Sequence, residues 1–220
     1  MTCRRHIPVV VFVLAAVMVG GAASIGAQEP GEWRFGGRLI YIDVDAVSQP
    51  FLDTESKIGL DSSTFLEFDT TYMLGENWGM EWMITIAPHD TKVVDGVFNG
   101  LDLGSVWVGE TTLTFNYMIL RGRWRPYVGA GLAAGYFLYS DTSSAAEAIG
   151  VDNVKSGLGW GPVGQIGLNH RLNKAWILSL DLKWIDMPID VKLEGSSGTI
   201  EEVEMDMDPL IIGLGAAVRF

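Results

Sequence analysis

Apolar and polar residues alternate with a period of two through most of the chain after residue 30. In residues 176–184 (WILSLDLKW), every second position is Trp or Leu, and Ser, Asp and Lys stand between them. A period of two places the two sets on opposite faces of a β-strand. No helical period stands out in the same region. The pattern therefore predicts an all-β fold.

Eight segments carry this alternation, and the connections between them differ in length. The segments are 33–47, 64–74, 78–87, 107–119, 125–139, 158–172, 175–187 and 207–220. Tight turns are expected at 75–77, 120–124 and 173–174, and long, polar, acidic loops at 48–63, 88–106, 140–157 and 188–206. An even strand number with short turns at one end is typical of outer-membrane barrels. We expect an eight-stranded antiparallel transmembrane β-barrel with short periplasmic turns and long extracellular loops.

The first residues follow a different pattern. Arg4 and Arg5 precede an apolar run over 7–19, and residues 20–27 are mostly small. This is the pattern of a secretory signal peptide, and the run is shorter than the roughly 20 residues of a membrane-spanning helix. We expect cleavage after Ala27, with cleavage after Ser24 as the alternative. Residues 1–27 would then be the signal peptide and 28–220 the barrel.

Alternation alone does not distinguish a membrane barrel from a secreted soluble barrel with an apolar cavity. Three tryptophans at the tight-turn ends of strands, Trp78, Trp124 and Trp176, favour an aromatic girdle at a membrane surface. The long loops lie on one side, the face opposite the apolar one is rich in small residues, and the chain ends on a strand at Phe220. The sequence therefore favours a multi-pass protein of the bacterial outer membrane, exported by the general secretory route.

Composition excludes several function classes. The net charge of −12 argues against a nucleic-acid partner, which needs a basic surface. The single cysteine, Cys3, falls in the expected signal peptide, so the mature chain would have no disulfide or reactive thiol. His89, expected at a loop start or rim, and His170 have no nucleophile at a suitable spacing. We expect no enzymatic activity, no cofactor and no metal site.

The face opposite the apolar one carries the residues expected to line the lumen. They are Glu67, Asp69, Glu81, Met83, Glu110, Asp181, Lys183 and Arg219. A buried ammonium is costly unless it is paired, so Lys183 is expected to pair with an acid at mid-height. An arginine facing lipid near the midplane would cost about 2–4 kcal/mol, so Arg38 is expected to face inward, with Phe35, Leu39 and Tyr41 outward. The excess of inward acids over inward bases predicts a preference for cations in any residual current.

Several stretches resemble the OmpW family of outer-membrane proteins. They are 72–81 (YMLGENWGME), 87–89 (APH), 125–131 (RPYVGAG), 182–186 (LKWID), 207–210 (MDPL) and 218–220 (VRF). Together they span nearly all of the mature chain in the family's order. The resemblance implies an eight-stranded barrel with a narrow, partly apolar lumen that passes small hydrophobic compounds. Phe220 closes an alternating set that resembles the C-terminal signal read by the outer-membrane insertion machinery.

The chain departs from the family pattern at two places. Members usually carry a Leu-Pro-Pro-Thr-Leu run entering the fourth strand, where this chain has Glu110 and no proline. Lys183 stands where an apolar or aromatic lumen residue is usual. The expected function is passive passage of small hydrophobic molecules, with outer-membrane lipid and lipopolysaccharide as surroundings. The alternative is a non-conducting structural barrel, or a receptor or adhesion barrel acting through its extracellular loops.

Overall fold

The computed structural model describes residues 30–44, 46–50 and 55–220. The expected signal peptide lies outside the described residues. In these described ranges, thirteen strands form one antiparallel sheet, and a short helix, α2 (Ser144–Ala148), lies between two of them in the sequence. No helix of the described residues is long and apolar enough to cross a membrane.

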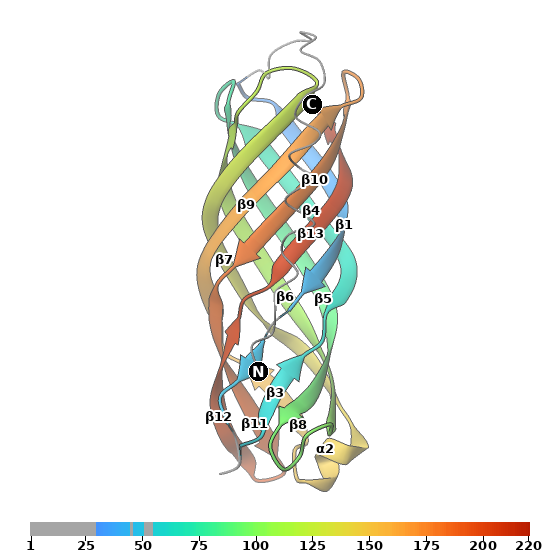
Figure 1. Cartoon of the computed structure of the whole chain (residues 1–220), viewed down its shortest axis with the longest axis vertical. Helices are drawn as coiled ribbons and strands as arrows, with labels where there is room; N and C mark the ends of the chain where they lie inside the picture. Colours follow the sequence, from blue (N-terminus) through green and yellow to red (C-terminus); the bar gives the residue numbers. More distant parts are fainter. Residues whose placement is uncertain (1–29, 45, 51–54) are drawn as a thin grey trace.

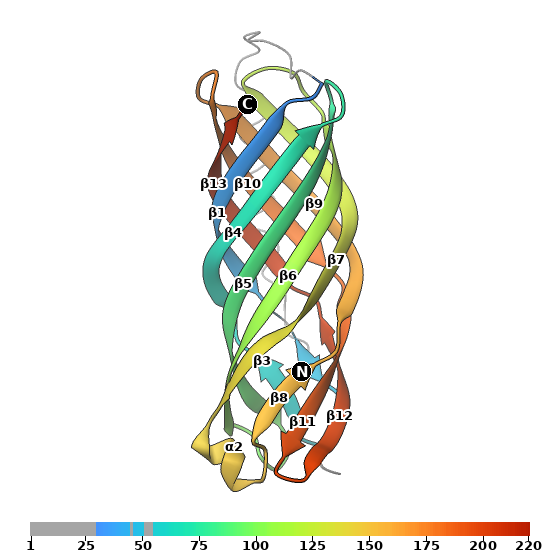
Figure 2. The same cartoon turned by 180° about the vertical axis from the view of Figure 1, so that it is seen from behind.

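Eight strands close into a barrel (Figures 1 and 2). They are β1 (Trp33–Asp43), β4 (Ser63–Met73), β5 (Trp78–Asp95), β6 (Asp102–Met118), β7 (Trp124–Thr142), β9 (Gly159–Arg171), β10 (Trp176–Ile185) and β13 (Leu210–Arg219). Neighbouring strands follow the order β4-β1-β13-β10-β9-β7-β6-β5, and the pairing of β4 with β5 closes the ring. The predicted eight-stranded antiparallel barrel is confirmed.

One end of the barrel, here called the turn end, carries the tight turns. The amide of Leu74 donates to the carbonyl of Trp78 at 2.9 Å, and that of Leu172 to the carbonyl of Trp176 at 3.0 Å. The C-terminus lies at this end (Figure 1). The amide of Phe220 donates to the carbonyl of Trp33 at 2.9 Å, so the last residue is tied to the first barrel strand.

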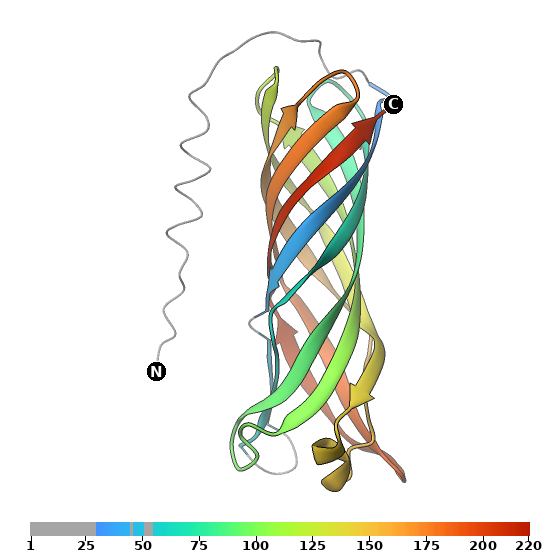
Figure 3. The ribbon, with the colours of Figure 1, turned by 90° about the vertical axis from the view of Figure 1, so that its right-hand side faces the viewer.

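The opposite end continues as a second β-structure, here called the distal extension (Figure 3). It consists of the ends of β5, β6 and β7 that lie farthest from the turn end, together with five further strands. These are β2 (Val47–Ser48), β3 (Lys57–Leu60), β8 (Asn153–Ser156), β11 (Met187–Gly195) and β12 (Gly198–Met207). The order β5-β3-β2-β12-β11-β8 carries the sheet from β5 to its edge at β8. Side-chain hydrogen bonds join β8 to β7; Ser156 Oγ, for example, accepts from the Phe137 amide at 2.7 Å.

The prediction of four long loops is therefore wrong in its detail, because strands occupy much of them. The reason is that the sense of the alternation reverses. On β5, Ile84 and Ile86 face outward, but Asp90 and Lys92 take the outward positions farther along the same strand. On β11, Ile189, Val191 and Leu193 are buried and the charged residues between them face out. Apolar-out strands suit lipid, whereas apolar-in strands suit water, so the two parts contact different solvents.

Candidate functional site

An ion-pair plug fills the middle of the barrel, and Arg38 is at its centre. Arg38 Nη1 lies 2.5 Å from Glu67 Oε1 and 3.5 Å from Asp181 Oδ2. Arg38 Nη2 lies 3.1 Å from Glu81 Oε2 and 3.3 Å from Asp69 Oδ1. One guanidinium from β1 thus joins acids of β4, β5 and β10. The predicted inward orientation of Arg38 is confirmed, and Leu39 faces outward.

Lys183 is the second cation of the plug. Its Nζ lies 2.7 Å from both carboxylate oxygens of Glu67 and 3.2 Å from Asp181 Oδ2. The Lys183 and Glu67 residues are 0% exposed. The plug, defined as Arg38, Glu67, Asp69, Glu81, Asp181 and Lys183, therefore contains four acids and two bases without open space around its central pair. Such a layer opposes straight passage of ions and polar solutes, since an entering solute has to replace buried ion pairs.

Two glycines make room for the plug. A Cβ atom at Gly36 would collide with the carboxylate of Asp69, and one at Gly213 with the carboxylate of Asp181. Both glycines lie on regular ladder positions of β1 and β13. Close approach of a carboxylate to the wall therefore explains glycine at these positions.

A neutral polar layer lies next to the plug on its turn-end side. Gln165 Nε2 lies 3.0 Å from Thr114 Oγ1, 2.6 Å from Asn116 Oδ1 and 3.4 Å from Glu81 Oε1. All three neutral residues are buried. The layer connects the plug to polar groups of β6 and β9 and fills the barrel on the turn-end side of the plug.

A turn-end arginine cluster forms the last layer, and only one of its members, Arg219, was predicted to face inward. Glu32 is paired with Arg34 at 3.0 Å, Arg219 at 3.1 Å and Arg171 at 3.8 Å. Arg125 is buried at the same end, with Nε 2.9 Å from the carbonyl of Gly122. Period-two alternation from Arg38 places Arg34 inward, and the same rule from Gly129 places Arg125 inward. The signal was therefore present in the sequence.

This cluster changes the charge balance of the interior. Arg219 faces inward as expected, but it pairs with Glu32 at the turn end and not with the acids of the plug. Glu32, Arg34, Arg125 and Arg171 must be added to the inward charges. The basis for the predicted cation preference, an excess of inward acids, is therefore wrong: the described interior holds as many bases as acids.

A distal apolar core fills the barrel on the other side of the plug. Its buried side chains come from the barrel strands and from the distal extension. They include Ile40, Ile42, Val93, Val106, Val108, Phe137, Met187, Val191, Leu193, Met205 and Met207. Met83 and Glu110 are also buried in the interior, at 0% and 6% exposure. The lumen is thus apolar toward the distal end and charged in the middle.

His89 is not at a rim. It lies on β5, is buried, and its Nδ1 is 2.9 Å from the carbonyl oxygen of Asp61. The expectation was wrong because β5 continues beyond Pro88, where it still pairs with β6. The ring of His170 contacts that of Trp124, with centroids 3.9 Å apart and the ring planes tilted by 38°.

The three tryptophans expected in an aromatic girdle are the first residues of β5, β7 and β10. Trp78, Trp124 and Trp176 are all exposed on the outer surface near the turns. Trp78 contacts Tyr117 with ring centroids 4.9 Å apart. Phe220 is also exposed. The roles of the tryptophans in a membrane girdle and of Phe220 in assembly remain predictions.

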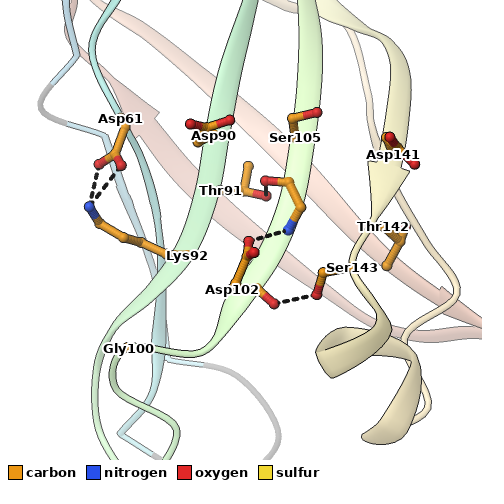
Figure 4. A pocket seen from close by; sticks show the side chains of 11 residues that line it. Asp61, Asp90, Thr91, Lys92, Gly100, Asp102, Ser105, Asp141, Thr142 and Ser143 are labelled. Atoms are coloured by element: carbon orange, nitrogen blue, oxygen red, sulfur yellow. Dashed lines mark hydrogen bonds and ion pairs between the residues drawn. The ribbon is translucent and has the colours of Figure 1, made fainter.

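A polar hollow lies on the outer surface of the distal extension, across β5, β6 and β7 (Figure 4). Its volume is about 540 Å³, and aspartates and hydroxyls line it. Lys92 is the basic residue of this lining. Its Nζ is 2.8 Å from Asp61 Oδ2, so it is already paired with an acid of the hollow. In the part of the chain that the structure describes, no group of three or more His, Cys, Asp or Glu side chains is placed to hold a metal ion.

Comparison with known proteins gives relatives of similar length. Outer membrane protein AlkL of Ectopseudomonas oleovorans is 25% identical over 228 residues, which cover 94% of this chain and 95% of the relative. The dibenzothiophene metabolism operon protein PahQ of Pseudomonas aeruginosa is 23% identical over 204 residues, covering 90% and 93%. Outer membrane protein W of Vibrio cholerae is 22% identical over 215 residues, covering 94% and 97%.

Solved structures agree with the architecture. The crystal structure of outer membrane protein OprG from Pseudomonas aeruginosa matches with a TM-score of 0.78 and 25% identity, covering 88% of this chain and 98% of that one. The solid-state NMR structure of AlkL in lipid bilayers shares the fold, with a TM-score of 0.69, 21% identity, and 91% and 95% covered. The model of the OmpW family matches residues 29–220. The chain belongs to the OmpW family and is a β-barrel of the bacterial outer membrane.

Proposed function

We propose that the barrel provides passive passage for small hydrophobic molecules. The observation that supports this proposal is that the distal apolar core lies directly against the distal side of the ion-pair plug. An apolar molecule that enters from the distal side leaves water and contacts apolar side chains instead. That transfer is favourable, because apolar surface is removed from water. The names of two relatives, which mention dibenzothiophene metabolism, support the same substrate class.

The plug determines the path in this proposal. Passage straight through the barrel would require an apolar molecule to displace buried ion pairs, which is unfavourable. Sideways exit between strands on the distal side of the plug, into the bilayer, avoids that step. The surrounding lipid then acts as the acceptor of the transported molecule.

The test is uptake of an apolar fluorescent dye, phenylnaphthylamine, by Gram-negative cells that produce the chain. Ala87 is buried on the inward face of β5, so Ala87→Phe should obstruct the interior and lower dye uptake several-fold. Ala130 is exposed on the outer face of β7, and Ala130→Phe is the matched control with the same added volume. Equal uptake with and without the chain would refute the proposal.

One observation favours a second function, a non-conducting structural or receptor barrel. The interior is tightly packed, and the cavity beside Glu110 has a volume of only about 10 Å³. In that case the outer surface of the distal extension would be the functional part, with lipopolysaccharide as its neighbour. Two results together would support this alternative. Cells that produce the chain would exclude the dye normally, and cells from which the chain is deleted would lose membrane integrity.

A further inference from the structure

The turn end of the barrel is basic, although the chain as a whole has a net charge of −12. The four arginines of the turn-end cluster share the interior there with one described acid, Glu32. Arg121, Arg123 and Lys174 add exposed bases in the adjoining tight turns. The Arg171 amide donates to the Arg123 carbonyl at 2.8 Å, so one of these turns lies directly against the cluster. Such an end attracts anions.

Glu32 is shared among three guanidinium groups. Its Oε1 lies 3.0 Å from Arg34 Nε. Its Oε2 lies 3.1 Å from Arg219 Nη1 and 3.8 Å from Arg171 Nη2. The four acids of the plug are engaged elsewhere, because each lies within 3.5 Å of the Arg38 guanidinium. Several cations held beside one shared carboxylate favour a further anion, since buried charge is unfavourable without a counter-charge.

Arg34 and Arg219 are the members of the cluster best placed to hold that anion. They stand directly opposite each other on β1 and β13, and like charges in this arrangement repel. Arg34 is 3% exposed, and its Nη2 has no hydrogen-bond partner among the described residues. The Arg219 side chain is 22% exposed, so the cluster is open to solvent on that side. Guanidinium groups match the geometry of phosphate oxygens, which they bind by paired hydrogen bonds.

We infer that Arg34 and Arg219 form a binding site for a phosphate group at the turn end of the barrel. Arg34 Nη2 and the exposed part of the Arg219 guanidinium donate hydrogen bonds to its oxygens. A free phosphate ion and the headgroup of an anionic phospholipid present this same chemistry. The inference is independent of the passage of apolar molecules, because the plug separates this site from the distal apolar core.

The experiment titrates the refolded barrel in a maltoside detergent, which contains no phosphate, and follows binding by phosphorus NMR. One arm adds inorganic phosphate and the other adds a short-chain phosphatidylglycerol, both at constant ionic strength set with sodium chloride. Arg34→Gln should weaken binding about tenfold or more, the effect of losing one strong, charged hydrogen bond. Arg219→Gln, at a partly exposed position, should weaken it similarly and keeps the test valid if Arg34→Gln fails to fold.

Arg121→Gln is the matched control, because it removes the same charge at the same end from a side chain that is exposed and paired with Glu76 at 2.5 Å. It should leave binding within about twofold. Gel mobility with and without heating verifies that each variant is folded.

Binding in the first arm alone identifies a free phosphate ion as the ligand, and binding in the second arm alone identifies a lipid headgroup. Binding in neither arm overturns the site. Equal losses in Arg121→Gln and in the folded Arg34→Gln or Arg219→Gln variant also overturn it, because they would show attraction to the basic surface in general.

Discussion

At the residue scale, the plug is stable only while each of its charged side chains has all of its partners. Lys183 and Arg38 are buried among four carboxylates, with Lys183 Nζ within 3.2 Å of three oxygens. Desolvation opposes burial of each charge, and the ion pairs together offset it only while every partner is present. Removing one cation leaves buried carboxylates without a partner of opposite charge. The loss of stability on substitution here therefore exceeds the contribution of any single ion pair.

Lys183→Met should therefore lower the free energy of unfolding by about 3–5 kcal/mol, the range for breaking a buried ion pair. Urea unfolding of the refolded barrel in detergent measures it. Lys192→Met is the control, since Lys192 pairs with Glu202 at 3.1 Å while both side chains are largely exposed. The control should change stability by at most about 1 kcal/mol. Equal losses in the two variants would contradict a stabilising role for the plug.

Much of the plug could be predicted from the sequence, because period-two alternation gives the direction of each side chain. Lys183 was expected among inward acids, and the penalty for a lipid-facing arginine turned Arg38 inward. The partners of each cation could not be predicted, since they depend on strand register and on gaps left by glycines such as Gly36. The turn-end cluster was not predicted, although the alternation extends to Arg34 and Arg125, because both residues lie at the very ends of the expected strands.

At the element scale, the strands of the distal extension show where the sequence is harder to interpret. Residues 187–193 alternate as clearly as the barrel strands, but their apolar side faces inward. Alternation alone does not reveal this reversal, and the acidic residues between them resemble a polar loop. Strands as short as β2 and β3 also fall below the length at which periodicity is informative.

The last strand gives a second prediction. Phe220 follows β13, is exposed, and its ring contacts Phe35 with centroids 6.1 Å apart. Deleting Phe220 removes little buried area, so refolding in detergent should remain nearly intact. Insertion in cells should fall several-fold if the residue is read by the insertion machinery.

The assay compares heat-resistant migration of refolded protein with the amount recovered in outer membranes. Phe35→Ala is the control, because it removes the other ring of the same contact and leaves the C-terminus intact. Similar losses for Phe220 deletion in both assays would indicate a packing role alone.

At the scale of the whole molecule, the interior is a series of layers with different chemistry. The distal apolar core, the plug and the turn-end cluster follow one another along the barrel, and all of them are filled with side chains. Because described inward acids and bases are equal in number, the interior has no strong overall preference for either sign of charge.

We therefore expect small conductance with weak ion selectivity in planar bilayers. The reversal potential in a salt gradient measures selectivity, and the single-channel amplitude measures conductance. Lys183→Met should change the current more than Lys192→Met, which alters only the exposed surface. A large, steady current from the unmodified chain would show that the layers do not close the barrel.

Along β5 the outward-facing residues change from apolar to charged. This change also determines how deeply the molecule sits in its bilayer. A shift toward the periplasm would carry Asp90 and Lys92 into hydrocarbon, where a lysine costs about 2–4 kcal/mol at the midplane. A shift the other way would do the same to Arg121, Arg123 and Lys174, which are exposed in the tight turns. Charges thus bound the apolar wall on both sides and hold it at one vertical position, so a bilayer of different thickness must deform to match the protein.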